Sequence, residues 1–202
     1  AGYQIAMHAN GDEAIEAGVG VFHRLLETHP RFDHRHRLEH VQMASDAMFR
    51  RMKSLGICVN LFANHVYFWG DTHRHDTMGP AKARHLDAVG TAVRMGIPHS
   101  IHSDAPVTPL APLFTMWCAV NRVTSSGHVL GESERISPID ALRAVTIGSA
   151  YLLNCDEEYG SIEVGKFADF TVLSADPCDV DPMEIKDIQV IATVLGGTVQ
   201  MN

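Results

Sequence analysis

The sequence predicts an α/β fold in which strands and helices alternate along one parallel sheet. Between residues 3 and 101, short apolar runs of strand length alternate with longer segments of helical periodicity. Three of the apolar runs end in a polar residue, at His8, His40 and Asp104. Parallel strands joined by helices present their carboxyl ends at one edge, so these three side chains are expected to share a rim.

The first unit joins an apolar strand at residues 3–7 to a helix. Asn10 precedes this helix and Glu13 follows three positions later, which predicts an N-cap with a capping box. Pro30 ends the helix, because proline cannot continue it. The predicted inner face consists of apolar residues at helical spacing, namely Ile15, Val19, Phe22 and Leu26.

The second unit has its strand near residues 36–41. Ser45 is the predicted N-cap of the helix that follows, and Gly56 closes that helix in a left-handed conformation. The predicted core stripe of this helix consists of Ala47, Met48, Met52 and Leu55.

Residues 57–61 form the third predicted strand. The segment 64–75 after it is interpreted as a long loop, and loops of that length usually carry function. A helix at 81–95 then leads through Gly96 to the fourth strand, at 97–101.

The remainder of the chain changes its period. Residues 113–123 are predicted to be helical, and Ser137 followed by proline opens a further helix. From Gly160 onward the apolar residues alternate with period two, and Gly196-Gly197 supplies a hairpin turn. This tail is predicted to be a small β element outside the parallel sheet, with Ile162, Val164, Phe170 and Val172 among its strand residues.

Composition excludes several classes of partner. The chain has 202 residues, a formal net charge of −8 and no basic stripe, so neither nucleic acid nor a membrane is expected as a partner. The sequence shows no signal peptide and no membrane-spanning run. Four widely spaced cysteines without a C-x-x-C pair indicate reduced thiols, as in a cytoplasmic protein.

Four motifs occur in order along the chain: 7–14 (MHANGDEA), 38–42 (LEHVQ), 102–107 (HSDAPV) and 160–169 (GSIEVGKFAD). Together they resemble the metal-dependent amidohydrolase superfamily. The branch to which they are most similar is amidohydrolase family 3, which includes N-substituted formamide deformylases. The resemblance covers nearly the whole chain, and four ordered motifs are more specific than any one of them.

The resemblance implies the C-terminal half of a TIM-like (β/α)8 barrel, strands five to eight, in residues 1–157. Residues 158–202 would then be the C-terminal part of a small β-sandwich domain. It also implies that His8, His40 and Asp104 bind metal, after strands five, six and eight. The His-x-His pair after strand one and the carboxylate or carboxylated lysine after strand four are expected upstream of this sequence.

The activity that the resemblance implies is metal-dependent hydrolysis of a C–N bond in an amide or formamide-like small molecule. Imidazole and carboxylate suit a divalent ion, and zinc is the ion expected. Asp104 would be catalytic, taking a proton from the attacking water and passing it to the leaving nitrogen. Two alternatives stay open: a deaminase of a cyclic substrate, and a folded fragment without activity.

Half a barrel would leave two strand edges and an apolar face open. A homo-oligomer, or an N-terminal half outside this sequence, is therefore expected to cover them. The segment 64–75 lies where a substrate pocket would be, and its candidate substrate-binding residues are His65, Tyr67, Trp69 and His73.

Two further His-x-His pairs and one single histidine are not assigned to the metal site. His34-x-His36 and His73-x-His75 imitate a metal-binding pair, but neither follows the first strand of a barrel. We interpret both as unrelated to that pair. His102 lies two residues before Asp104 and would share its face only if the strand continued that far.

Overall fold

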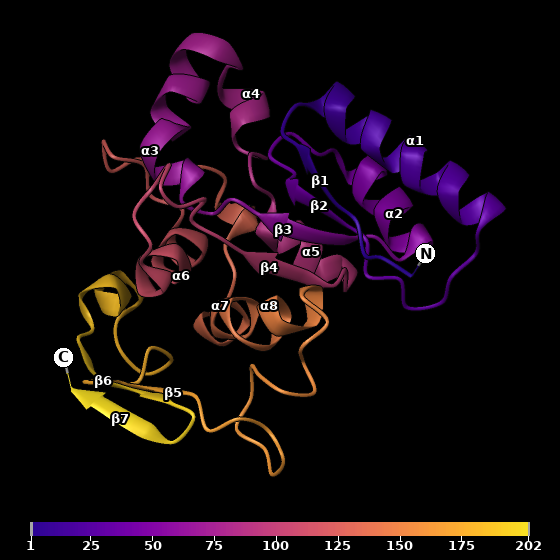
Figure 1. Cartoon of the computed structure of the whole chain (residues 1–202). Coiled ribbons are helices and arrows are strands. Elements are labelled where there is room, and N and C mark those ends of the chain that lie inside the picture. The colour runs from indigo at the N-terminus through magenta and orange to yellow at the C-terminus, as the bar shows by residue number, and fades with distance from the viewer. Residues whose placement is uncertain (1, 202) are drawn as a thin grey trace.

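A computed structural model describes residues 2–201 and shows two separate sheets (Figure 1). Eighteen elements follow one another along the chain: β1 (Ala6–Ala9), α1 (Asp12–Thr28), β2 (Arg37–His40), α2 (Asp46–Leu55), β3 (Cys58–Leu61), α3 (His65–Thr72), the π-helical turn η1 (His73–Thr77), α4 (Pro80–Ala83), α5 (Val89–Met95), β4 (His99–Ile101), α6 (Pro112–Asn121), the 3-10 turn η2 (Glu132–Glu134), α7 (Pro138–Val145), α8 (Ile147–Leu152), β5 (Phe170–Leu173), the 3-10 turn η3 (Pro182–Asp187), β6 (Val190–Leu195) and β7 (Thr198–Met201).

The first sheet is parallel and follows the chain in the order β1-β2-β3-β4. This arrangement confirms the α/β class and the four strands in the predicted places. Residues in register alternate between two faces of the sheet. One face carries Leu38 and Val59, which are fully buried, while the other carries Glu39 and Asn60, which are half-buried.

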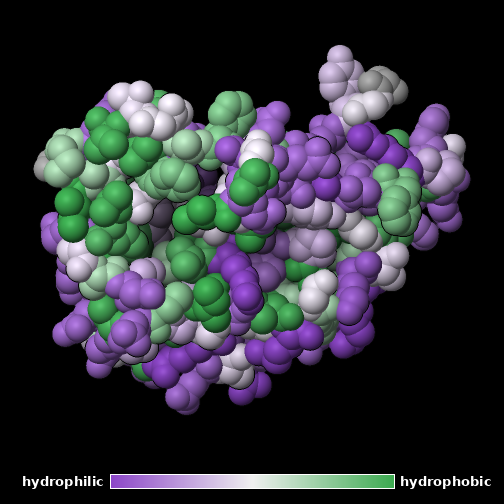
Figure 2. Space-filling model, turned by 90° about the horizontal axis from the view of Figure 1, so that it is seen from below, coloured by the Kyte–Doolittle hydropathy of each residue, from purple (hydrophilic) through white to green (hydrophobic). Residues whose placement is uncertain are grey.

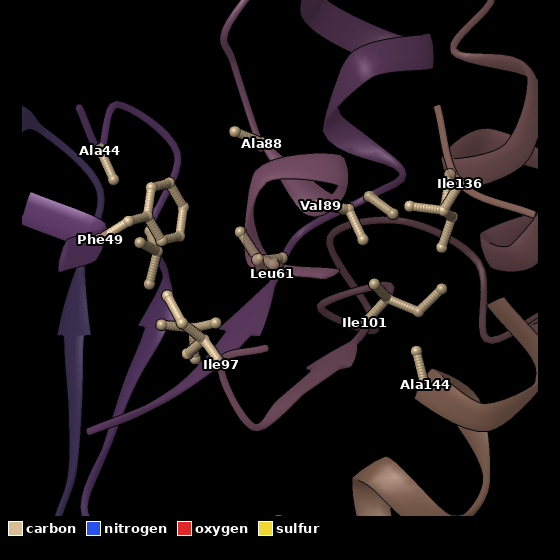
Figure 3. Close-up of a cluster of buried hydrophobic side chains, with 14 of the residues drawn as sticks. Ala44, Phe49, Leu61, Ala88, Val89, Ile97, Ile101, Ile136 and Ala144 are labelled. Carbon is tan, nitrogen blue, oxygen red and sulfur yellow. The ribbon is translucent and has the colours of Figure 1, made fainter. Parts of the chain in front are cut away.

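Helices cover the apolar face of this sheet. A Cβ atom on Gly18 of α1 would lie 2.9 Å from Leu38, so this glycine allows α1 to pack closely on β2. Figure 3 shows Phe49 of α2 beside Ile97, just before β4. Val89 of α5 lies in the same buried cluster. The opposite face, which carries Glu39 and Asn60, is therefore turned away from these helices.

Capping explains where α2 begins and ends. Ser45 accepts a hydrogen bond from the backbone of Met48, and Gly56 adopts a φ of 69°, so both predicted caps are confirmed. The capping box before α1 is wrong, because its N-cap is Gly11, without a side-chain bond. The core stripe of α2 is partly wrong as well, since Ala47 is exposed and Phe49 is buried instead.

Other predicted boundaries are corrected by the backbone. The segment interpreted as a long loop forms α3 and η1 instead. The predicted helix at 81–95 divides into α4 and α5, because Asp87 adopts a φ of 47° that no helix can contain. The helix opened by Ser137 divides at Thr146, whose ψ of −98° breaks it into α7 and α8.

The second sheet is antiparallel, in the order β5-β6-β7, and confirms a separate β element. Gly196 and Gly197 form its hairpin turn, with φ values of 54° and 80°. Ile162 and Val164 lie outside any strand, so the predicted start of this element is wrong. Figure 2 shows hydrophobic side chains gathered on the side that this sheet occupies, and the exposed hydrophobic residues of the sheet include Phe170, Leu195, Val199 and Met201.

The turn η3 fastens the second sheet to the helical layer. The indole nitrogen of Trp117 in α6 donates to the carbonyl of Met183 at 3.0 Å, and Asn121 donates to the carbonyl of Pro182 at 2.8 Å. Ile185 of the same turn is fully buried. Within residues 2–201, no helix combines the length and the hydrophobicity that a membrane crossing requires.

Candidate metal centre

Left-handed backbone occurs where β2 and β4 lead into the loops that follow them. His40 and Val41 adopt φ values of 73° and 54°, and Asp104 adopts 53°. Such left-handed conformations are uncommon outside glycine and cost free energy, so the surrounding structure must hold them. Here the amide of Val41 donates to the carbonyl of Ala9 at 3.1 Å, which keeps β2 beside β1 as the chain turns.

This strained edge, which we call the rim, brings three ligand-type side chains together. One potential ligand atom from each of His40, His102 and Asp104 lies within 4.8 Å of the others. His40 is buried, whereas His102 and Asp104 are half-buried. An imidazole and a carboxylate at this spacing suit a divalent transition metal, and the second imidazole lies beside them.

His102 reaches the rim because the β4 ladder extends one residue beyond the strand. Its amide donates to the carbonyl of Leu61 at 2.9 Å, continuing the pairing with β3. The chain then turns at Asp104, whose amide donates to Nδ1 of His102 at 3.0 Å. A sequence cannot show that the ladder continues in this way, so the sequence alone does not assign His102 to the rim.

The bond to Nδ1 fixes the tautomer of His102. Because this nitrogen accepts a hydrogen bond, a neutral His102 carries its proton on Nε2. Burial lowers the pKa of His102 to about 4, so the ring is neutral near pH 7. Its Nε2–H is therefore a hydrogen-bond donor rather than a metal ligand, and this buried nitrogen has no well-formed hydrogen bond, although the backbone of Asn60 lies close enough to raise the pKa of the ring.

His40 meets the requirements of a ligand more closely. Its Nδ1 is buried and makes no hydrogen bond, which is costly for a polar atom unless a ligand occupies the position. Burial lowers the pKa of the ring, so the neutral form that binds metal predominates at pH 7. The negative charge of Asp104 acts in the opposite direction and raises the pKa of His40 by a smaller amount. The residues present therefore fit a divalent ion.

His8 lies at the end of β1, outside the three residues named above. It is exposed, and its ring meets that of His40 edge on, with 4.6 Å between centroids. His8 thus lies beside His40 at the carboxyl edge of the sheet, while Asp104 is grouped with His40 and His102. The function of the predicted set as a metal site stays a prediction, as does the catalytic role of Asp104.

A hydrogen-bonded polar row supports the rim from below. Arg37 donates to Glu39 at 2.6 Å, and Glu39 accepts from Asn60 at 2.6 Å. Ser100 then donates to the side-chain oxygen of Asn60, also at 2.6 Å. This row crosses β2, β3 and β4 on the face away from the helices, so it fixes the relative positions of the strands that carry the rim.

Helix α3 places part of the predicted substrate-binding set beside the rim. The His65 ring stacks on Trp69 with centroids 5.0 Å apart, and His73 approaches the other side of His65. Phe62 lies between this group and the rim, at 5.5 Å from His65 and 5.1 Å from His102. Phe62 carried no signal in the sequence beyond its place after β3.

Tyr67, the fourth predicted substrate-binding residue, packs elsewhere. It lies edge on to Phe114 and Trp117, at 5.2 and 5.8 Å between ring centroids, with Phe68 on another side. Its neighbours therefore belong to the interface between α3 and α6. Another contact that the sequence did not indicate is that of the buried Asp87 with His65, at 3.3 Å.

Comparison with known proteins adds an independent line of information. The profile of the amidohydrolase family matches residues 1–200. YtcJ of Bacillus subtilis, which is named as an amidohydrolase, is 32% identical over 98% of this chain and 37% of its own length. The N-substituted formamide deformylase of Arthrobacter pascens is 30% identical, over 98% of this chain and 36% of the deformylase. The chain thus spans a little over a third of the length of these relatives.

The backbone is also similar to solved structures. An uncharacterised metal-dependent hydrolase from Pyrococcus horikoshii superposes with a TM-score of 0.76 at 24% identity, over 90% of this chain and 36% of that protein. At this identity the likeness concerns the fold. The profile match, in contrast, covers almost every residue, and the motifs that suggested the resemblance fall within it. The chain belongs to the amidohydrolase family, in its family 3 branch.

Proposed function

We propose that the protein containing this chain is a metal-dependent hydrolase of C–N bonds in small amide or formamide-like substrates. The observation that carries the proposal is the grouping of His40, His102 and Asp104 within 4.8 Å at the carboxyl edge of a parallel sheet. In α/β proteins this edge is where ligands bind. Likeness to a formamide deformylase supports the choice of bond.

In this proposal His8, His40 and Asp104 hold one divalent ion, for which zinc fits the donor set. When bound, the ion supplies an activated water and polarises the substrate carbonyl. Asp104 accepts the proton of the attacking water and delivers it to the leaving nitrogen. His102 offers its Nε2–H to a substrate oxygen, because its Nδ1 is already engaged by the Asp104 amide.

The substrate would enter between the rim and α3. His65, Trp69 and His73 are the residues proposed to bind it, with the Trp69 ring offering an apolar face, whereas Tyr67 packs between α3 and α6. The same proposal makes residues 1–157 the C-terminal half of a (β/α)8 barrel and residues 158–202 part of a β-sandwich domain. A second copy of the chain, or an N-terminal half, would complete the sheet. Four cysteines without a disulfide support a reducing, cytoplasmic location.

Elemental analysis tests the metal site. We expect Asp104→Ala and His40→Ala each to contain one equivalent of divalent ion less per chain than the parent sequence. His23→Ala and Asp179→Ala remove exposed residues of the same types and serve as matched controls. Equal metal content in all five proteins, with folding unchanged by circular dichroism, would contradict the site.

Activity is tested separately, on the longer protein. Formate release from an N-substituted formamide is expected to require Asp104 and to be lost in Asp104→Asn. Release of ammonia from a cyclic amidine, without formate, would indicate the deaminase alternative. Bound metal without either product would indicate a folded protein that is inactive toward both substrate classes.

A further inference from the structure

A second pair of histidines lies outside the rim, where α3 passes into η1. The Nε2 atoms of His65 and His73 face one another at 3.4 Å. His65 is buried and His73 is half-buried, so the pair lies at the edge of the interior, within reach of solvent. The turn that carries His73 is a π-helix, a rare geometry that occurs frequently at functional sites.

The outer nitrogen of each ring lies next to an oxygen atom, in an ion-pair contact for His65 and a hydrogen bond for His73. Nδ1 of His65 lies 3.3 Å from Oδ2 of Asp87, a carboxylate that is completely buried. Nδ1 of His73 lies 2.7 Å from the hydroxyl oxygen of Thr77. Histidines that bind metal almost always donate their second ring N–H to a carboxylate, a carbonyl or water. The His65 and Asp87 pair has the same arrangement.

These outer contacts determine what the inner nitrogens present. When both Nδ1 atoms carry protons and donate outward, both Nε2 atoms present lone pairs to each other. Two lone pairs at 3.4 Å repel one another unless a positive charge lies between them. A proton shared by the rings or a metal ion bound by both would supply that charge.

We propose that His65 and His73 bind a divalent transition metal ion through their Nε2 atoms, at a site separate from the rim. The distance of 3.4 Å between the two Nε2 atoms supports a metal ion between them. Two nitrogens in a tetrahedral zinc site, each about 2.0–2.1 Å from the ion, lie roughly 3.3–3.4 Å apart. The remaining positions on the ion face the half-buried side of His73, where water can complete the coordination.

The site would add a cation to the part of α3 that lies beside the rim. Phe62 lies beside both His65 and His102, and it separates the two sites. Asp87 acts here as a positioning residue, because its carboxylate favours the proton on Nδ1 of His65, and Thr77 positions the ring of His73. The inference concerns binding alone and does not depend on the hydrolase activity proposed above.

Titration with Co²⁺, followed by its visible absorption, tests the site. The rim is first silenced with His40→Ala, and we expect this variant still to bind one Co²⁺. Adding His73→Ala is expected to weaken that binding at least about tenfold, since it removes one of two protein ligands. Thr77→Val is expected to weaken it by roughly tenfold, the lower end of the range for residues that orient a ligand.

His75→Ala in the same background is the matched control. His75 is two residues away, exposed, and paired with Arg74 rather than with another histidine. It should leave Co²⁺ binding unchanged. The proposal is overturned if His40→Ala binds no Co²⁺, which would mean that the pair shares only a proton. It is also overturned if His73→Ala and His75→Ala behave alike. The elemental analysis of Asp104→Ala remains independent of either result.

Discussion

The two ends of the parallel sheet contain the same residue types in opposite states. At the amino end, His34 bonds through Nε2 to the carbonyl of Leu55 and through Nδ1 to the amide of His36. His36 in turn accepts from the amide of Ile5. At the carboxyl end, His40 and His102 each keep a buried nitrogen without a well-formed hydrogen bond. Buried imidazole rings therefore make stabilising hydrogen bonds at the amino end, whereas at the carboxyl end they keep a nitrogen that a ligand could bind.

Backbone strain does not make this distinction. Asp33 and Arg35 at the amino end have φ values of 46° and 50°, close to the 53° of Asp104 at the rim. What differs is the hydrogen bonding of the strained residues and their neighbours. Arg35 is fully engaged by two carboxylates and a carbonyl. Unpaired polar atoms, rather than strain, thus mark the functional end of the sheet.

The largest effect is expected from Arg35 at the amino end. Its guanidinium bonds Asp33 and Asp156 and lies 3.9 Å over the ring of Tyr151. Arg35→Leu should lower the free energy of unfolding by about 2 kcal/mol, since charge-assisted bonds contribute about 1.5–3 kcal/mol and partial exposure reduces this. Urea denaturation measures the loss. A change below about 0.5 kcal/mol would show that this end is not the stabilising one.

The pH dependence of stability gives a second measure of the amino end. Burial lowers the pKa of His36 in the folded protein, so the unfolded chain takes up a proton first as the pH falls below about 6.5. The contribution of His36 to stability should therefore decrease on acidification, until its folded-state pKa is reached, by at most about 1.4 kcal/mol per pH unit. His40, His73 and His102, whose pKa values burial also lowers, add contributions of the same sign. His36→Leu should reduce the slope, whereas the exposed His23→Ala should not. Identical slopes would contradict this assignment.

A variant of the N-cap of α2 is expected to lower the stability of the protein without changing its metal content. Ser45 begins this helix on the side of the rim, accepting from Met48 at 3.3 Å. Ser45→Ala should cost about 1 kcal/mol in thermal or urea unfolding. Ser54→Ala, on the exposed side of the same helix, is the control. Metal content should be equal in both variants, and loss of metal in Ser45→Ala would mean that the rim depends on this cap.

The smallest effect on stability is expected at the rim itself. His40→Leu replaces an unpaired polar ring with an apolar side chain of similar size, so the metal-free protein should change by about 0.5 kcal/mol or less. Urea unfolding in the presence of a chelator measures this. His36→Leu at the other end is the matched comparison and should lose more. If the two losses were equal, the contrast between the ends would disappear.

The sequence was sufficient to predict the strands and the residues at their ends. Apolar runs of strand length indicated all four strands, although β1 spans Ala6–Ala9 rather than residues 3–7, and His8, His40 and Asp104 were recognised because each ends or follows such a run. The motif context made these three residues more than isolated polar groups. Local caps such as Ser45 and Gly56 were equally readable, because their effect is contained within one turn of chain.

Features set by distant contacts were not readable. His102 joins the rim because its amide continues the ladder with Leu61, forty-one residues earlier in the chain. The partnership of Asp87 with His65 depends on the break before α5, which the periodicity of 81–95 concealed. The helical state of α3 was missed for a similar reason, since its aromatic residues pack against α6 rather than along one amphipathic face.

The packing of α3 and α6 gives this protein two built-in optical reporters. The chain has two tryptophans, and they occupy different environments. Trp69 is half-buried and stacks on His65, so its emission senses the charge carried by that ring. Trp117 is buried and donates to Met183, so its emission senses whether the C-terminal sheet remains attached to α6. Replacing either tryptophan with phenylalanine leaves the emission of the other alone. The change near His65 and the detachment of the C-terminal sheet can then be followed separately.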